Sequence, residues 1–269
     1  MKLKLAILDM NAAVANQGMR CIQEITGEVA SHFDIDVFDV RAGSAVPDLS
    51  YDVYISSGGP GSPYDGDGDW NLRWKQLLDD VLAHNQQPGS KKKFMFLICH
   101  SFQMACIHFG VGSTVNRNGR SFGVLPVYKT HEGAMEPLFS ALPDPLYAVD
   151  VRDWQVVDVD FDALREKAIK VLAIEQPREK PNLPRAIMAV RFSPEIIGTQ
   201  FHPEADADGM LRYYQQPEKR KETIDTYGEG RYHDILNHLN DEDKVLLTHA
   251  TILPGFIGQA LSYFEGVRV

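Results

Sequence analysis

The stretch FMFLICHSFQMACIHF, residues 94–109, joins a short apolar run to a helical pattern, with a cysteine between the two. Residues 94–98 are all apolar, which predicts a buried β-strand. Residues 102–109 favour a helix that begins just past Cys99. Because ligands of open α/β sheets collect at the carboxyl ends of the strands, this junction predicts a functional cysteine.

The segments before this stretch alternate in the same way between short apolar runs and helical patterns. Further strands are predicted at residues 4–8, 35–40 and 53–56, and helices at residues 18–33 and 70–84. This alternation is typical of an α/β fold with an open, mostly parallel sheet and helices on both faces. We therefore expect a flavodoxin-like architecture in which Cys99 occupies a strand-to-helix nucleophile elbow.

The second half of the chain has less regular patterns. Strands are predicted at residues 123–128, 146–151, 186–191 and 196–201, and we expect them to form an added antiparallel edge. The chain divides into a predicted catalytic domain, residues 1–205, and a C-terminal helical extension, residues 206–269, packed on the same domain. Within the extension, residues 218–222 are interpreted as a solvated connector, and Pro254 with Gly255 is expected to break the last helix.

Composition excludes several classes of partner. With 27 basic and 37 acidic residues the formal charge is -10, which repels phosphate backbones and anionic lipid, so neither a nucleic-acid nor a membrane partner is expected. No stretch approaches the roughly 20 apolar residues of a membrane span. The 3 cysteines, too few for a disulfide framework, indicate reduced thiols and a cytoplasmic protein. The histidines lack a metal-ligand spacing, so no metal and no cofactor are expected.

A glycine-rich segment, SSGGPGSP at residues 56–63, follows the third predicted strand. Its glycines permit a backbone turn whose N–H groups point at an anion. A plain turn is one interpretation, whereas a phosphate loop is disfavoured because the glycine-lysine-serine or threonine ending is absent. As an oxyanion hole, the N–H groups of Gly59 and His100 would stabilise charge on an attacked carbonyl.

A third segment, GTQFHPE at residues 198–204, ends an apolar run. If that run is a strand, positions two apart share a face, and His202 and Glu204 point the same way. A carboxylate that orients an imidazole gives the base and the orienting group that a cysteine nucleophile needs. The alternatives are a surface histidine beside a turn proline and, for Cys99, a buried structural thiol. Three segments together favour catalysis.

These segments resemble the class I glutamine amidotransferase family. FLICHSFQ, residues 96–103, is similar to its nucleophile motif, Gly-x-Cys-x-Gly-x-Gln. SGGPGS, residues 57–62, is similar to its oxyanion loop, and QFHPE, residues 200–204, to its histidine and glutamate motif. SFGVLPV, residues 121–127, is similar to the strand that follows the nucleophile helix. Over residues 1–205 the chain is similar to the glutaminase domain of GMP synthase.

The resemblance implies an activity and a role for each matching residue. Cys99 would attack the side-chain amide of glutamine to give a γ-glutamyl thioester and ammonia, and water would release glutamate. His202 would relay protons and Glu204 would hold it in position. Gly59 and His100 would be the oxyanion donors. Gly58 and Gln103 would contact the substrate. The ammonia would pass to a partner synthase or be released.

Two departures from the family pattern bear on the substrate. Leu97 and Ser101 replace glycines beside the cysteine, and Leu97 is expected to shift the elbow or fill part of the pocket. The family's serine-histidine segment that contacts substrate is missing, and only Arg152 and Asp153 are candidates to replace it. These departures keep two alternatives open: a stand-alone γ-glutamyl hydrolase or acyltransferase with the same triad, and a non-catalytic regulatory homologue.

Overall fold

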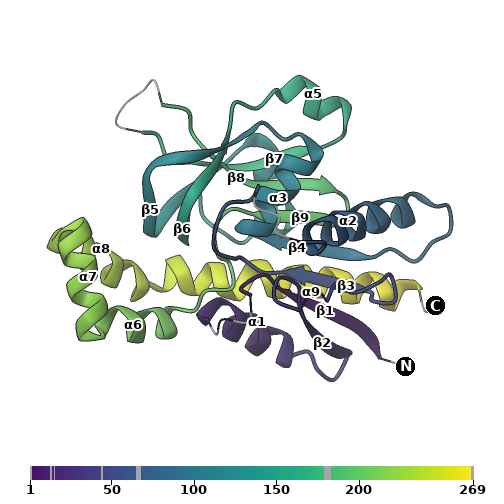
Figure 1. The fold of residues 1–269 in the computed structure, drawn as a ribbon, viewed down its shortest axis with the longest axis horizontal. Coiled ribbons are helices and arrows are strands. Elements are labelled where there is room, and N and C mark those ends of the chain that lie inside the picture. The colour runs from purple at the N-terminus through teal and green to yellow at the C-terminus, as the bar shows by residue number, and fades with distance from the viewer. Residues whose placement is uncertain are drawn as a thin grey trace.

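The computed structural model describes residues 2–12, 14, 16–43, 45–64, 68–178 and 183–267. Within these residues the strands form a nine-stranded sheet in the order β2-β1-β3-β4-β9-β8-β7-β5-β6 (Figure 1). The strands are β1 (Leu3–Asp9), β2 (Phe33–Asp39), β3 (Val53–Ser56), β4 (Phe94–Ile98), β5 (Ser113–Lys129), β6 (Leu146–Val157), β7 (Lys170–Glu175), β8 (Ile187–Ser193) and β9 (Ile196–Thr199). The predicted α/β fold is confirmed.

Helices connect and cover the strands. They are α1 (Gln17–Gly27), α2 (Trp70–Gln86), α3 (His100–Phe109), α4 (His131–Ala134), η1 (Pro137–Phe139), α5 (Phe161–Glu166), α6 (Ala207–Gln215), α7 (Pro217–Tyr227), α8 (Glu229–Leu239), η2 (Glu242–Leu246) and α9 (Leu247–Val267). The six predicted elements that lead up to Cys99 all occur, although α1 ends several residues before the predicted boundary. The short α4 and α5 escaped prediction because one or two turns give no recognisable period.

The parallel half of the sheet is buried on both faces. β1 pairs in parallel with β2 and β3, β3 with β4, and β4 with β9. In β1, Leu5 and Ile7 pack with residues of α1 and α9, while Ala6 and Leu8 pack with residues of α2 and α3. Figure 1 shows these helix pairs on opposite sides of the sheet. Burial on both faces explains why β4 is apolar throughout and does not alternate.

The remaining strands form an antiparallel half, as expected, with one difference. β5 pairs with β6 and β7, β7 with β8, and β8 with β9, all antiparallel. β9 is not part of an outer edge, because its other neighbour is β4 and it closes the parallel half. This central position brings the segment that follows β9 beside Cys99. β7, which the sequence patterns missed, lies between β8 and β5.

The C-terminal helices differ from two expectations. Residues 218–222 belong to α7 and are not a connector. Pro254 lies inside α9, which continues to Val267 without a break. A proline in a helix interior costs about 3 kcal/mol. Its neighbours Leu253 and Phe256 are buried, and each large side chain buried contributes roughly 1.5–3 kcal/mol, so packing on the sheet outweighs the lost hydrogen bond.

The segment from Glu242 to Gly266 is also long and apolar enough, by length and composition alone, to cross a membrane. Its apolar side chains are instead packed in the core, where the buried ones are Ile252, Leu253, Phe256, Ile257, Ala260 and Phe264. Such packing is typical of the core helix of a globular domain. The division of the chain near residue 205 stays a prediction.

Phe256 offers a test of how much α9 stabilises the sheet. Its ring lies 5.2 Å from that of Phe96 and 6.4 Å from that of Phe94 on β4. We expect Phe256→Ala to lower the free energy of unfolding by about 3–5 kcal/mol, because it leaves a cavity in a packed interior. Urea denaturation would measure the loss. Leu246→Ala is the control, since that side chain is 39% exposed and should cost about 0.5 kcal/mol or less. Equal losses in both variants would contradict a core role for α9.

Candidate active site

Four loops meet at the carboxyl edge of the parallel strands. The segments that follow β1, β3, β4 and β9 contribute Asn11, Gly58, Cys99 and His202 to the wall of a cavity of about 410 Å³. The amino end of α1 closes one side of this cavity. All three segments that the sequence singled out therefore come together at the edge where open α/β sheets bind ligands.

Cys99 occupies the sharp junction between β4 and α3. It is the single residue between the two elements, and its φ of 47° and ψ of -95° are unusual for a residue with a side chain. Its N–H donates to the Thr199 carbonyl at 2.8 Å, which ties the junction to the end of β9. A strained backbone of this kind costs of order 1–3 kcal/mol and concentrates at functional sites. Here it turns the Cys99 side chain into the cavity.

His202 and Glu204 lie together, but not for the predicted reason. β9 ends at Thr199, so the two residues belong to the loop that follows and not to a continued strand. The loop is held because the His202 N–H donates to the Val149 carbonyl of β6 at 2.9 Å. The His202 Nδ1 atom lies 2.8 Å from Glu204 Oε1, and the Glu204 side chain is 2% exposed.

The electrostatic surroundings favour a protonated His202. Burial alone lowers its pKa, but the Glu204 carboxylate and then Cys99 raise it, and the net pKa is well above the ordinary value. A buried carboxylate favours the imidazolium because opposite charges attract strongly away from water. A positive His202 in turn stabilises negative charge on the Cys99 sulfur.

The glycine loop packs its backbone against both Cys99 and His202. A Cβ atom on Gly58 would lie 2.9 Å from His202 Cε1 and 3.4 Å from Cys99 Cβ, so a side chain there would displace the ring. A Cβ on Gly59 would overlap the Met10 carbonyl oxygen. Asn11, which the sequence patterns did not single out, fixes the loop by donating from Nδ2 to the Gly58 carbonyl at 3.1 Å.

The two departures beside Cys99 are accommodated without filling the pocket. Leu97 is fully buried in the core beneath α2 and α3, and it is not among the described residues that line the cavity. The expectation that Leu97 fills part of the pocket is therefore wrong. Gly198, its direct partner on β9, makes the room, because a Cβ there would lie 3.1 Å from Leu97 Cβ. Ser101 Oγ donates to the Ser57 carbonyl at 2.7 Å and thereby ties α3 to the glycine loop. Where the family has a glycine, the Ser101 hydroxyl thus adds a hydrogen bond between α3 and the glycine loop.

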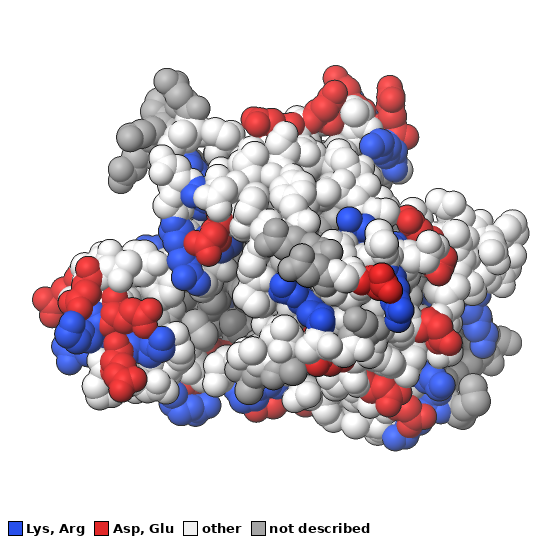
Figure 2. All heavy atoms as spheres, viewed as in Figure 1, with Lys and Arg blue, Asp and Glu red and all other residues white. Residues whose placement is uncertain are grey.

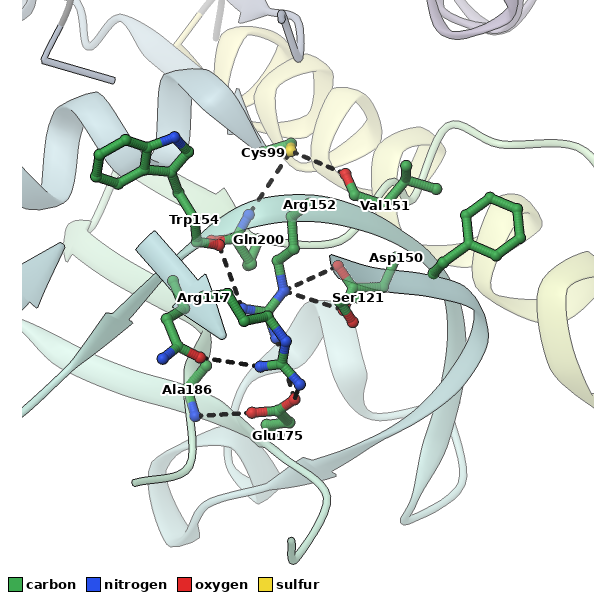
Figure 3. A network of polar contacts seen from close by, with 12 residues as sticks. Cys99, Arg117, Ser121, Asp150, Val151, Arg152, Trp154, Glu175, Ala186 and Gln200 are labelled. Carbon is green, nitrogen blue, oxygen red and sulfur yellow. Dashed lines mark hydrogen bonds and ion pairs between the residues drawn. The ribbon is translucent and has the colours of Figure 1, made fainter. Parts of the chain in front are cut away.

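Two buried glutamines lie behind the sulfur. Gln103 does not line the cavity among the described residues; its Nε2 donates to the Trp154 carbonyl at 3.3 Å and to Gln200 Oε1 at 3.0 Å. The Trp154 carbonyl fixes the orientation of the Gln103 amide, so Gln200 must present its Oε1 to Gln103. Gln200 Nε2 then points to Cys99 Sγ, 3.6 Å away (Figure 3). The substrate contact implied for Gln103 stays a prediction. Gln200 stands in the QFHPE motif but had no assigned role.

Arg152 does not replace the missing substrate-contact segment. Successive side chains of β6 alternate, so Val149 and Val151 face the cavity while Asp150 and Arg152 face away from it. Figure 3 shows Arg152 directed toward the carboxylate of Asp150, 3.0 Å away. Arg152 also pairs with Glu175 at 3.3 Å.

The buried cluster around Glu175 anchors this part of β6. Burial opposes the charge of Glu175, but Arg152 and Arg117 outweigh it and hold its pKa below the ordinary value. Arg117 lies 2.7 Å and Arg178 3.2 Å from the carboxylate. Buried charges of this kind need such partners to offset their desolvation. The cluster fixes the strand whose Val151 carbonyl lies 4.0 Å from Cys99 Sγ.

Helices of the C-terminal region also reach the site. His249 on α9 has its Nδ1 atom 2.9 Å from the Glu204 carbonyl oxygen. Asp206, the N-cap of α6, pairs with Arg20 of α1. No sequence motif indicated these contacts, because they join residues 45 and 186 positions apart.

The fold and the site together define an α/β protein with a cysteine, a histidine and a glutamate around one cavity. The family model described as glutamine amidotransferase class-I matches residues 7–212. The chain belongs to the class-I glutamine amidotransferase family, as the sequence motifs predicted. Members of this family are in general enzymes that hydrolyse the side-chain amide of glutamine. No curated protein matches the chain.

Several solved structures share the fold. A glutamine amidotransferase from Thermotoga maritima is 17% identical, with a TM-score of 0.70 over 97% of this chain and 98% of that one. A glutamine amidotransferase from Methylobacillus flagellatus is 15% identical, with a TM-score of 0.66 over 96% and 94%. A protein from Thermoplasma acidophilum, described as part of a putative GMP synthase, is 19% identical, with a TM-score of 0.58 over 100% and 99%.

The environments of the cysteines predict different reactivities. Burial raises the pKa of Cys21 to about 12, and burial also raises the pKa of Cys106 well above its ordinary value. We expect iodoacetamide at pH 7 to label Cys99 at least about tenfold faster than either, because the thiolate is the attacking species and His202 stabilises it. Mass spectrometry of peptides over time measures the rates. Cys99→Ser should remove the fast phase, and equal rates at all three thiols would contradict the assignment.

Gln200 is predicted to support the reactivity of Cys99. Gln200→Met removes the N–H donor at similar volume, and we expect alkylation of Cys99 to slow by about three- to tenfold at pH 7. Gln200→Glu places an acceptor or a negative charge beside the sulfur and should slow alkylation further. Circular dichroism verifies that both variants are folded. A rate in Gln200→Glu equal to wild type would show that the contact has no electrostatic effect.

Proposed function

We propose that this protein hydrolyses the side-chain amide of a γ-glutamyl substrate, glutamine in the simplest case, with Cys99 as nucleophile, His202 as proton carrier and Glu204 as its orienting carboxylate. The observation that carries the proposal is the meeting of these three side chains at one cavity, with Gly58 packed against both Cys99 and His202. A thiol, an imidazole and a buried carboxylate in this order are the parts of a catalytic triad.

In the proposed reaction the Cys99 sulfur bonds to the γ-carbonyl carbon of the substrate. The carbonyl oxygen takes up negative charge, which the N–H groups of Gly59 and His100 stabilise. His202 gives its proton to the departing nitrogen, the C–N bond breaks, and a γ-glutamyl thioester remains on Cys99. Water then attacks the thioester with His202 as base and releases glutamate. Gly58 and Gln103 are the proposed substrate contacts carried over from the family.

Ammonia is the second product when glutamine is the substrate, and we propose that a synthase partner uses it. Two proteins of similar fold support this part of the proposal by their descriptions. One is the putative GMP synthase component, and the other is the glutaminase domain of a CTPS from Trypanosoma brucei, 14% identical over 76% of this chain. A stand-alone hydrolase of other γ-glutamyl amides is the second candidate, favoured by a further cavity beside the site.

Substitutions in the triad test the proposal. We expect Cys99→Ala and His202→Ala each to lower glutamate release from glutamine by roughly 10³-fold or more, because nucleophile and base act as a unit. Glu204→Gln should leave a measurable residue of activity, since it removes only orientation and charge. It should also lower the pKa of His202, because Glu204 is the largest influence that raises it. The alkaline limb of the pH–rate profile, where His202 loses the proton that it gives to the departing nitrogen, then moves to lower pH.

A coupled glutamate assay and mass spectrometry of the intact protein provide the measurements. Cys106→Ala is the control for loss of a buried sulfur, and it should keep the wild-type rate because Cys106 lies in the core and does not line the cavity among the described residues. Near-normal turnover in His202→Ala, or a thioester adduct on a cysteine other than Cys99, would contradict the triad.

A further inference from the structure

A second cavity of about 560 Å³ lies directly beside the proposed catalytic cavity. The two share Asn16, Gln17, Arg120, Val151 and Met210 in their walls, so they are continuous. Val151 spans the junction, since its carbonyl oxygen lies 4.0 Å from Cys99 Sγ and it lines both cavities. When the carbonyl carbon of a substrate lies at the Cys99 sulfur, the group bonded to that carbon therefore needs to extend past only one residue, Val151, to enter the second cavity.

Aromatic rings form much of the wall of this second cavity. Phe122 of β5 is stacked on Tyr227 of α7, with centroids 4.6 Å apart and an interplanar angle of 5°. The edge of Tyr214 meets Phe122 at 5.7 Å, and Tyr213 meets Tyr214 at 5.3 Å. Such rings offer planar faces and edges to another ring, a contact worth about 0.5–1.5 kcal/mol beyond the buried area.

The size and lining of the second cavity do not fit the product of glutamine hydrolysis. Ammonia resembles water in size, and one water takes about 30 Å³ of the liquid, far below the volume of this cavity. Side chains that suit the charged ends of a glutamyl group, Asn11, Arg20 and Asp206, line the catalytic cavity instead. The aromatic cavity is thus available for the group on the nitrogen side of the scissile amide.

The charges around this cavity indicate no polyanionic partner. Lys219 pairs with Glu222 at 2.8 Å, and both line the cavity. Figure 2 shows acidic and basic side chains mixed over α7 and α8, with neither sign gathered into a patch. The aromatic wall, more than net charge, therefore selects the occupant.

We propose that the second cavity binds the amine half of the substrate, and that this half carries an aromatic ring. The proposal rests on the proposed function and names its substrate class as γ-glutamyl arylamides. Cys99 Sγ bonds to the γ-carbonyl carbon, the C–N bond breaks, and the aromatic amine leaves with a proton from His202. Water then hydrolyses the thioester, so that the products are glutamate and the free arylamine.

The test compares γ-glutamyl anilide with glutamine on wild-type protein and three variants. We expect kcat/KM to be at least about tenfold higher for the anilide, in line with one ring packed among aromatic side chains. Tyr213→Ala should lower kcat/KM for the anilide by about tenfold and for glutamine by less than about twofold. Thr226→Trp, which fills the second cavity, should act in the same selective way.

Tyr128→Ala is the matched control. Tyr128 is also half-buried and lies under a cation, Arg185 at 5.5 Å from its ring, as Tyr213 lies under Lys219 at 5.4 Å. Tyr128 lines neither cavity among the described residues. We expect this variant to retain wild-type kcat/KM for both substrates. Equal losses with anilide and glutamine in Tyr213→Ala, or no preference for the anilide in the wild type, would overturn the proposal.

Calorimetric titration of Cys99→Ala separates this proposal from the proposed function. Tighter binding of γ-glutamyl anilide than of glutamine, weakened by an added Tyr213→Ala, supports the aromatic cavity whether or not the wild type turns the anilide over. Binding without any wild-type turnover would reject the triad and keep the cavity. Turnover of glutamine with no anilide binding would keep the triad and reject the cavity, leaving it open to a segment of a partner protein.

Discussion

Three loops converge at Gly58, where one added methyl group would lie 2.9 Å from the His202 imidazole and 3.4 Å from Cys99 Cβ. The loops follow β3, β4 and β9, three adjacent strands of the parallel half. Their spacing is set by the sheet, because hydrogen-bonded strands lie about 4.8 Å apart. The site depends on this spacing, because the loop after β3 lies so close to the nucleophile and its base that Gly58 has no room for a side chain.

The C-terminal helices stabilise the fold and also shape the site. α9 buries its apolar face on the sheet and brings His249 to the Glu204 carbonyl. α6 and α7 pack against β5 and β6 and supply the rings of Tyr213, Tyr214 and Tyr227 beside the catalytic cavity. The two groups of helices belong to separate hydrophobic clusters on opposite faces of β6, so α9 supports Glu204 while α6 and α7 shape the second cavity.

The sequence by itself determined the elements that carry their own pattern. β3 and β4 were predicted with their observed bounds, and the helix of residues 70–84 nearly so, because apolar runs and periods are local properties. The class-I glutamine amidotransferase family also followed from three short motifs in order. Asn11 and His249 lie in no motif and were not predicted at the site, and Gln200 lies in a motif that did not indicate its role.

Only the tertiary structure decided what surrounds the sulfur. The proximity of His202 and Glu204 was expected from a strand, but it arises in a loop that Val149 holds from across the sheet. Arg152 was expected at the substrate and is instead buried with Asp150 and Glu175, because alternation along β6 turns it away. The aromatic cavity joins β5 and β6 to helices that follow about 60 to 100 residues later. Such contacts depend on how distant segments pack, which no local pattern encodes.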